Sequence, residues 1–424
     1  MLIEKRDSLK GEINVPGDKS ISHRAIVLCS LAKGTSEIDG FLLSEDCIST
    51  IDCLRKMQVG IEIISNTKLK IHGNGIRGLA APSSNLNTGR SGTALRLILG
   101  VMSGQDFGSV VTRNESAQRK PLGRIVKVLR QMGANISGRD DSNLCPLTVS
   151  PSNLHGGTFN LSNMDTHIKT PILTASLYAE GPTKIVEATR SRDHTELMLG
   201  HLGCKITAEN NTIFTSGVEE LYAERIQIPG DISLAAYFIT AGILVPNADI
   251  TIKNVGINPT RAGIIEVYKK MGANIELQNE RVLNNEKIAD INVKTSKLKA
   301  TVIEGDTIPT LLDEIPIITV AACLAEGTTI FKNLRGYKIK ESGKLHTLSN
   351  ELAKMGASIE ETSDGLVIHG GKTLKGTVIE SGNDHTIALT TSIAGLVAED
   401  ETMVRKAQIL DIVYPEFVDI LNGL

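Results

Sequence analysis

Residues 15–25 read VPGDKSISHRA, and residues 228–233 repeat the opening of this stretch as IPGDIS. Pro and Gly favour a turn out of an extended segment, and the Asp or Ser that follows is suited to cap a helix. An apolar run comes after each copy, so both copies are predicted to lead into buried helices. The alternative is that Pro-Gly-Asp is a common turn that recurs by chance. The similar apolar runs favour a pair of hinge segments, at which the chain leaves one domain and later returns to it.

A second phrase recurs at intervals of roughly 70 to 85 residues and is typical of a helix that ends in Gly before a strand. Its copies are KMQVGI from residue 56, QMGANI from 131, HLGCKI from 201, KMGANI from 270 and KMGASI from 354. Together with the apolar helices that precede them, these copies predict about six units that alternate strands and helices. Because those helices are apolar nearly all round, we expect them to be buried against sheets in a protein of the α/β class.

The Pro-Gly-Asp phrase sorts the predicted units into two groups of three. We expect one discontinuous domain made of residues 1–16 and 230–424, and a second domain made of residues 17–229. The hinges are predicted at residues 15–20 and 228–233. Both domains are long enough to bury a core of their own.

The composition excludes several classes of protein. The formal net charge is −3 and aromatic residues make up only 3% of the chain, so nucleic acid is not an expected partner. The sequence has no apolar run long enough to span a membrane and no signal-peptide core, so we expect a cytoplasmic protein without a membrane partner. The six cysteines lack CxxC spacing, which predicts buried free thiols rather than a metal cluster or disulfides.

Nine stretches of the chain, in order, resemble the 5-enolpyruvylshikimate-3-phosphate synthase family. They are VPGDKSISHRAIVLCSLAKGTSEI, RSGTALRLILG, KPLGRIVKVLRQMGANI, SRDHTELMLGHLG, IPGDISLAAYFITAGILVP, NVGINPTRAG, LLDEIPIITVAACLAEGTT, KIKES and NDH. The resemblance covers essentially the whole chain, and PGDKSISHRA alone is a specific signature. It implies the enolpyruvyl transferase fold, a two-domain inside-out α/β barrel in which each domain has three βαββαβ-like units and the domains close on ligands at the hinge.

The same resemblance implies a reaction of the shikimate pathway, which leads to aromatic amino acids. The enolpyruvyl group of phosphoenolpyruvate is transferred to the 5-hydroxyl of shikimate 3-phosphate, and phosphate is released. The family needs no metal and no organic cofactor, and it is usually monomeric. The partners expected for this chain are therefore small anionic substrates.

Addition of a hydroxyl to an enol ether carbon needs one group to take the hydroxyl proton and another to protonate the methylene carbon. The resemblance implies that Asp313 and Glu341 are the two catalytic carboxylates, and that Lys19 completes the catalytic set between the two anions. A carboxylate before an apolar run is, on its own, more often a helix cap, but the joint occurrence of these residues in family order favours the catalytic interpretation. Further substrate-binding positions implied by the resemblance are Ser20, Arg24, Gly92, Thr93, Arg192, Lys340 and His385.

The resemblance weakens where the family binds phosphoenolpyruvate with arginine, whose planar fork makes paired bonds to carboxylate and phosphate. The family pattern RKRPM is QRKPL here, which places Lys120 at an arginine position. KESDR is KESGK, which places Gly343 at an aspartate and Lys344 at an arginine. DHR becomes Asp-His-Thr with Thr386 last, and the lysine before the closing Tyr-Pro pair becomes Ile412.

The shikimate 3-phosphate site is altered as well. Asp165, Thr166 and His167 stand where the family has Ser-Ala-Gln or Ser-Ser-Gln. A carboxylate that faces a phosphate is repelled unless it is protonated or paired with a cation. Arg90 stands where the family usually has Asn, so we predict that Arg90 is the partner of Asp165.

Three interpretations of the function stay open. The first is the family reaction itself, with weaker binding of phosphoenolpyruvate. The second is a paralogue in a specialised pathway that acts on a phosphorylated shikimate-like carbocycle without phosphoenolpyruvate, by loss of phosphate or water. The third is a non-catalytic homologue, against which the retained Lys19, Asp313 and Glu341 argue. The second Pro-Gly-Asp copy has Ile232 in place of Lys19, so it is expected to keep the turn without facing the anions.

Overall fold

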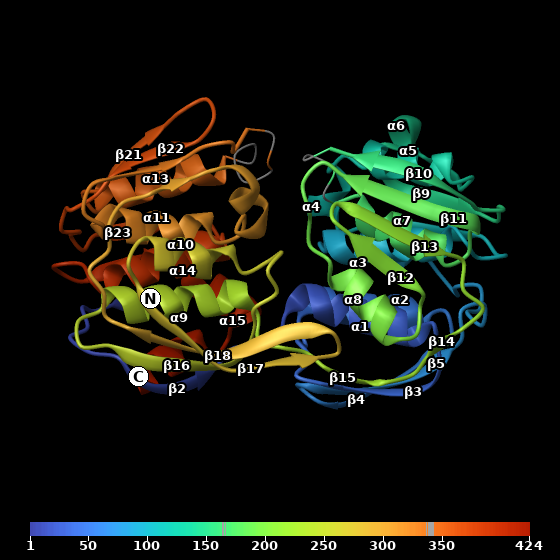
Figure 1. Ribbon diagram of the computed structural model, residues 1–424, viewed down its shortest axis with the longest axis horizontal. Coiled ribbons are helices and arrows are strands. Elements are labelled where there is room, and N and C mark those ends of the chain that lie inside the picture. The colour runs from blue at the N-terminus through green and yellow to red at the C-terminus, as the bar shows by residue number, and fades with distance from the viewer. Residues whose placement is uncertain (163–164, 166, 336, 338–342) are drawn as a thin grey trace. The chain divides into compact units, whose positions relative to one another are not determined.

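A computed structural model describes residues 1–162, 165, 167–335, 337 and 343–424 (Figure 1). Three of the predicted site residues, Thr166, Lys340 and Glu341, lie outside the described residues. The chain divides into two compact units. Unit 1 comprises Met1–Pro16, Pro229–Val282 and Lys287–Leu424, and unit 2 comprises Gly17–Ile228 and Leu283–Glu286. The small segment Leu283–Glu286, the tip of a hairpin, was not predicted to belong with unit 2.

Unit 2 has three sheets that repeat one pattern: a parallel pair followed by antiparallel pairs (Figure 1). The first sheet contains β14 (Leu221–Tyr222), β15 (Arg225–Gln227), β3 (Ala32–Asp39), β5 (Lys68–Asn74) and β4 (Gly60–Ser65). The second has the order β6 (Leu86–Asn87), β7 (Ser109–Thr112), β9 (Leu144–Ser150) and β8 (Asn135–Gly138). The third has the order β10 (His155–Leu161), β11 (Glu180–Glu187), β13 (Thr212–Ser216) and β12 (Ile206–Glu209).

The helices of unit 2 include a central group that is buried almost all round. The longer helices are α1 (Lys19–Ser30), α2 (Glu45–Arg55), α3 (Gly92–Met102), α5 (Gly123–Gln131), α7 (Lys169–Ser176) and α8 (His194–His201), and the short ones are α4 (Glu115–Gln118) and α6 (Arg139–Ser142). All eight residues of α7 are buried, and α3 packs against both α7 and α1. The apolar helices therefore form the centre of the unit, as their sequences predict.

Unit 1 follows the same plan. Its sheets have the orders β17 (Asn274–Leu283), β18 (Glu286–Lys294), β16 (Asp249–Gly256), β2 (Lys10–Asn14); then β19 (Val302–Ile303), β20 (Thr328–Phe331), β22 (Leu366–His369), β21 (Ser358–Glu361); and β1 (Leu2–Ile3), β24 (Thr402–Arg405), β23 (Val378–Glu380). Its helical segments are α9 (Ile232–Leu244), α10 (Gly263–Lys270), η2 (Gly305–Thr310), α11 (Ile315–Leu324), α13 (Lys344–Lys354), α14 (His385–Gly395), η3 (Ala407–Ile409), α15 (Leu410–Val413) and α16 (Phe417–Gly423). The buried helices α9, α11 and α14 contact one another at its centre.

The two Pro-Gly-Asp turns begin corresponding helices. Asp18 accepts a hydrogen bond from the Ile21 backbone at the start of α1, and Asp231 accepts one from Ser233 at the start of α9, both at 2.8 Å. The two copies are paired directly, because the Asp231 backbone N–H donates to the Pro16 carbonyl at 2.9 Å. Their role as hinges stays a prediction.

Several expectations from composition can be compared with the described residues. All six cysteines are free and buried, as predicted, and burial raises the pKa of the Cys29 and Cys53 thiols to about 12. Within the described ranges there is no helix with the length and apolar character needed to cross a membrane. The same residues hold no cluster of three or more His, Cys, Asp or Glu side chains suited to a metal ion.

A buried ion cluster joins α7 to the third sheet of unit 2. Lys169 is 2% exposed, and its Nζ lies 2.7 Å from Oε1 of Glu196 and 3.1 Å from Oε2 of Glu187. The ammonium also donates to the Ser191 carbonyl at 3.2 Å. Burial alone would lower the pKa of Lys169, but the two carboxylates raise it above its usual value. The lysine is therefore charged and holds both carboxylates in the interior.

Replacement of Lys169 with Met is expected to lower the free energy of unfolding of unit 2 by about 3–5 kcal/mol, because two buried carboxylates lose their cation. Urea unfolding followed by circular dichroism measures the change. Lys205 is exposed, so Lys205→Met is the matched control and should change stability by less than about 0.5 kcal/mol. Equal stabilities of the two variants would show that Lys169 does not neutralise the cluster.

Candidate active site

The first two turns of α1 carry three of the predicted site residues of unit 2, which are Lys19, Ser20 and Arg24. Lys19 is the first residue of the helix, and its half-exposed side chain forms an ion pair with Asp46 of α2. Burial would raise the pKa of Asp46, but the charge and hydrogen bond of Lys19 hold it below its usual range. Lys19 is thus a charged group at a helix N-terminus, where an anion is also favoured by the backbone N–H groups.

Arg24 lies one turn further along α1 and is fixed by three hydrogen bonds. Its Nε donates to Thr195 Oγ1 at 2.8 Å, one terminal nitrogen donates to the Ser20 carbonyl at 2.8 Å, and the other donates to Thr170 Oγ1 at 3.2 Å. The residue is only 6% exposed. Its guanidinium is therefore held in one orientation by α1, α7 and α8.

Four arginines of unit 2 are close enough to affect one another. Burial, together with the charges of Arg24, Arg113 and Arg192, lowers the pKa of Arg96 to about 10. No hydrogen-bond partner of Arg96 Nε is found among the described residues. A group of like charges around a partly unsatisfied guanidinium is the electrostatic arrangement expected of an anion site.

The sequence-based selection of site residues missed Arg96 and Arg113. A signal for Arg96 was present, because it follows Gly92 by four residues in SGTALR and therefore lies on the same helix face, one turn from the start of α3. The space between them is small: a Cβ built on Gly92 would lie 3.2 Å from a terminal nitrogen of Arg96. No comparable signal marked Arg113, which reaches this region by folding and donates to the Arg90 carbonyl at 3.1 Å.

His23 connects the helices that carry these residues. Its Nδ1 is hydrogen-bonded to Thr50 Oγ1 of α2 at 2.9 Å, and its Nε2 is hydrogen-bonded to Ser91 Oγ at 3.0 Å. Ser91 is the N-cap of α3 and also accepts from the Ala94 backbone at 3.1 Å. Burial, assisted by the charge of Lys19, lowers the pKa of His23 from 6.5 to about 3. A neutral imidazole therefore supports the start of α3, where the predicted residues Gly92 and Thr93 lie.

In unit 1 the predicted site residues also lie at helix starts. Asp313 is two residues ahead of α11, with its side chain 58% exposed and its Oδ2 3.6 Å from Arg261. Lys344 is the first residue of α13, and His385 is the first residue of α14. The Lys344 Nζ lies 2.8 Å from Asp384 Oδ2 and 3.5 Å from Thr386 Oγ1, so two positions altered from the family pattern are in contact.

The family EPSP synthase (3-phosphoshikimate 1-carboxyvinyltransferase) matches residues 3–421. The chain belongs to the EPSP synthase family. It is 48% identical over 422 residues to the 3-phosphoshikimate 1-carboxyvinyltransferase of Thermoanaerobacter sp. strain X514, covering 100% of this chain and 99% of the relative. To the enzyme of that name from Bacillus subtilis strain 168 it is 44% identical over 422 residues, covering 99% and 98%.

A solved EPSP synthase from Acinetobacter baumannii has a TM-score of 0.91 to this chain at 37% identity, covering 100% of this chain and 97% of that one. The predicted two-domain α/β enolpyruvyl transferase fold is therefore confirmed. The match over residues 3–421 also confirms the family that the sequence motifs indicate.

One prediction about the EPSP synthase site is wrong. Asp165 is paired with Arg124, whose terminal nitrogen lies 3.3 Å from Oδ1, and it also accepts from Ser162 Oγ at 2.5 Å. Arg90 instead forms an ion pair with Glu45 at 3.1 Å. Arg124 is the second residue of α5, so the carboxylate is paired with a cation that the family motif does not indicate.

The remaining predicted residues lie at or near the surface. Lys120 follows α4 and is exposed, His167 is exposed just before α7, and Ile412 is 51% exposed in α15. Arg192 is half-buried in the segment that precedes α8. Within unit 2, the structure brings Lys19, Arg24 and Arg192 together with Arg96 and Arg113, and within unit 1 it brings Lys344 together with the start of α14.

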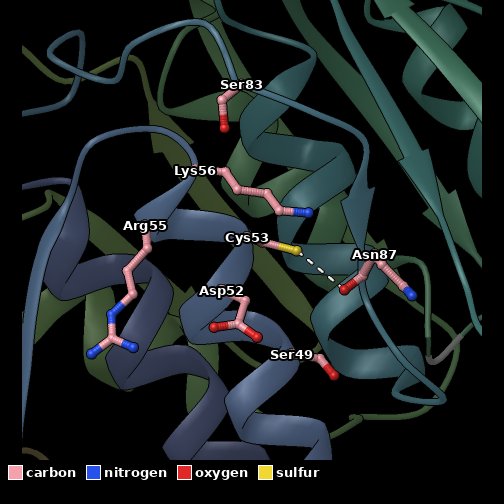
Figure 2. Close-up of a pocket in the computed structure, with 7 residues that line it drawn as sticks. All are labelled: Ser49, Asp52, Cys53, Arg55, Lys56, Ser83 and Asn87. Carbon is pink, nitrogen blue, oxygen red and sulfur yellow. Dashed lines mark hydrogen bonds between the residues drawn. The ribbon is translucent and has the colours of Figure 1, made fainter.

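A separate pocket of about 520 Å³ on unit 2 contains none of the predicted site residues (Figure 2). Its lining residues are Ser49, Asp52, Cys53, Arg55, Lys56, Ser83 and Asn87. Cys53 Sγ donates to the Asn87 carbonyl at 3.3 Å, and Lys56 Nζ donates to the Asn85 carbonyl at 2.8 Å. These hydrogen bonds connect the C-terminal part of α2 with β6 and the residue just before it.

The buried His23 makes the stability of this protein depend on pH. In the unfolded chain the imidazole has its ordinary pKa near 6.5, so between pH 6.5 and about 3 the unfolded chain binds a proton that the folded protein does not. The free energy of unfolding must therefore fall with pH below 6.5, by up to about 1.4 kcal/mol per pH unit. His23→Gln should reduce the loss of stability between pH 7 and pH 5 by about 2 kcal/mol.

Urea unfolding at the two pH values measures this difference. His155 is exposed, so His155→Gln is the matched control, and it should keep the pH dependence of the original protein. The same loss of stability in His23→Gln and the original protein would contradict a neutral buried His23.

Proposed function

We propose that this chain catalyses the reaction for which its relatives are named, transfer of the carboxyvinyl group of phosphoenolpyruvate to the 5-hydroxyl of shikimate 3-phosphate. The observation that carries the proposal is identity of 43% to 48% over 422 residues to enzymes of that name. Small anions are the only partners that the proposal requires. The monomeric state implied by the family resemblance and the cytoplasmic location expected from the composition belong to the same proposal.

Unit 2 supports the binding of a phosphorylated acid. Lys19 stands at the N-terminus of α1, and the arginine group that includes Arg24 and Arg96 gathers positive charge with a free donor at Arg96 Nε among the described residues. Fixed cations and helix N-terminal N–H groups bind phosphate and carboxylate oxygens well. We assign shikimate 3-phosphate to this region, with Ser20, Gly92, Thr93, Asp165, His167 and Arg192 as further contacts.

Unit 1 supplies the proton-transfer group in this proposal. The exposed carboxylate of Asp313 accepts the proton of the 5-hydroxyl as its oxygen bonds to C2 of phosphoenolpyruvate, while a second acid protonates the C3 methylene. Loss of phosphate from C2 and of a proton from C3 then restores the vinyl group. Glu341 and Lys340 are proposed from the sequence alone for the second acid and a contact to the acceptor, because they lie outside the described residues.

The altered contacts to phosphoenolpyruvate are expected to affect affinity more than chemistry. Lys120 and Lys344 retain a positive charge but lack the planar fork that binds carboxylate or phosphate through two parallel bonds. Lys344 is also paired with Asp384, which competes with a substrate anion for its ammonium. The relatives from Thermoanaerobacter and Bacillus subtilis are both named for the carboxyvinyl transfer, which favours the family reaction over the paralogue interpretation.

Incubation of the purified protein with shikimate 3-phosphate, with and without phosphoenolpyruvate, tests the proposal. We expect inorganic phosphate only when both are present, together with a product heavier by the enolpyruvyl group in the mass spectrum. Phosphate released without phosphoenolpyruvate would establish an elimination instead. No turnover in either mixture would refute the proposed function.

Restoring the family arginines should tighten the binding of phosphoenolpyruvate. The triple variant Lys120→Arg, Lys344→Arg, Thr386→Arg is expected to lower the KM for phosphoenolpyruvate about tenfold or more, because each paired bond adds on the order of 1.5 kcal/mol. Steady-state kinetics at saturating shikimate 3-phosphate measures it. The exposed residues Lys205, Lys127 and Thr207 provide the matched triple change to Arg, which should leave KM unaltered. If KM were unchanged in both triple variants, positions 120, 344 and 386 would not contact phosphoenolpyruvate.

A further inference from the structure

Arg261 is at the centre of a buried polar cluster in unit 1. It is 5% exposed, and one of its terminal nitrogens donates to Oε1 of Glu314 at 2.7 Å. The other terminal nitrogen donates to Ser233 Oγ and lies 3.8 Å from Asp231 Oδ1 and 3.6 Å from Asp313 Oδ2. A single planar guanidinium thus reaches three carboxylates and one hydroxyl at the same time.

The second Pro-Gly-Asp turn provides one side of this cluster. Asp231 caps α9 through the Ser233 backbone, and Ser233 Oγ donates to Oε1 of Glu314 at 2.6 Å. The turn that lacks a lysine therefore binds a buried carboxylate and its arginine through its serine.

Glu314 provides the other side and is adjacent to Asp313 in the chain. Its side chain is fully buried, it is the N-cap residue of α11, and its backbone N–H donates to the Leu311 carbonyl at 3.0 Å. A buried carboxylate needs a paired cation, which Arg261 supplies. Because the side chain of Glu314 is anchored in the core, the backbone from which Asp313 projects is anchored as well.

The loop that carries Arg261 is itself well supported. Asn258 accepts two hydrogen bonds from this loop. Its side-chain oxygen accepts from the Thr260 backbone N–H at 2.9 Å, and its carbonyl accepts from the Arg261 backbone N–H at 2.8 Å. Gly263 allows the loop to approach η2 closely, since a Cβ at this position would lie 1.9 Å from Thr310 Oγ1. The loop is thus packed against the segment that leads into Asp313.

We propose that Arg261 is a positioning residue for Asp313, and that the second Pro-Gly-Asp turn anchors this arrangement through Ser233. The inference rests on the proposed function, in which the Asp313 carboxylate takes the proton of the acceptor hydroxyl. Arg261 is buried and lies 3.6 Å from Oδ2 of Asp313, whose side chain is 58% exposed. Only arginine has the fork needed to reach Glu314 with one nitrogen and the Ser233–Asp313 side with the other.

The central test is a double-mutant cycle between Arg261→Lys and Asp313→Asn. Arg261→Lys keeps the charge beside Glu314 but removes the fork, so kcat should fall about 10- to 100-fold while KM for each substrate changes by less than about twofold. In the Asp313→Asn background the same change should lower kcat by less than about twofold, because the positioned group is already absent. Arg405→Lys is the matched control, since Arg405 is an exposed arginine of unit 1 paired with Glu380.

A role limited to stability gives a different pattern. The proposal would be overturned if the double variant lost kcat by the product of the two single-variant losses, since the two residues would then act independently. It would also be overturned if Arg261→Lys were as active as Arg405→Lys. If Arg261→Lys does not fold, Ser233→Ala takes its place in the cycle, with a fall in kcat of about 3- to 10-fold expected from the loss of one anchor.

Turnover of the original protein separates this inference from the proposed function. If the original protein makes no product, the proposed function fails, and crystal structures of the original protein and Arg261→Lys then decide the positioning role. A displaced Asp313 carboxylate in the variant supports it, and superimposable carboxylates refute it.

Discussion

The central helices of both units are buried along their sides, so polar chemistry is confined to their ends. The first turn of a helix leaves backbone N–H groups without partners inside the helix, and these groups need a cap or an anion. In this protein Asp18, Ser91, Asp231 and Asp384 supply caps for α1, α3, α9 and α14. The first turns of α1, α3 and α14 also hold five of the candidate site residues, which are Lys19, Ser20, Gly92, Thr93 and His385. The packing of apolar helices inside sheets therefore determines where the functional groups can be.

Charge in unit 2 is arranged around this constraint. The cluster of Lys169, Glu187 and Glu196 is closed, since its cation and carboxylates face one another in the interior. The arginines around Arg96 form a group of like charges, in which burial and the neighbouring cations together lower the pKa of the Arg96 guanidinium to about 10. An anion that binds there relieves the repulsion, so the folded unit should become more stable as ligand is added.

Much of the fold could be predicted from local patterns. The apolar helices, the Gly that follows α5, α8, α10 and α13, and the repeated Pro-Gly-Asp turn are determined by a few adjacent residues, and these patterns led to the α/β class. After α2 the corresponding positive-φ residue is Gln58 instead of Gly. The family was indicated by the nine stretches that resemble it. The site was less predictable because side-chain partners come from distant parts of the chain. Arg90 was paired with Asp165 on family order alone, whereas the fold gives that aspartate to Arg124. Arg261 and Glu314 are separated by a sheet and several turns, so no local pattern indicates that they meet.

The pairing of β2 with β16 has a consequence for synthesis of the protein. Residues Lys10–Asn14 lie parallel to Asp249–Lys253, although all but a hairpin tip of unit 2 lies between them in the chain. On the ribosome, β2 therefore has no strand partner while almost all of unit 2 is synthesised. Unit 2 can fold during translation, whereas unit 1 can close its first sheet only after residue 294 has emerged. A nascent chain paused before β16 would display an unpaired β2, the edge at which chaperones or premature association act.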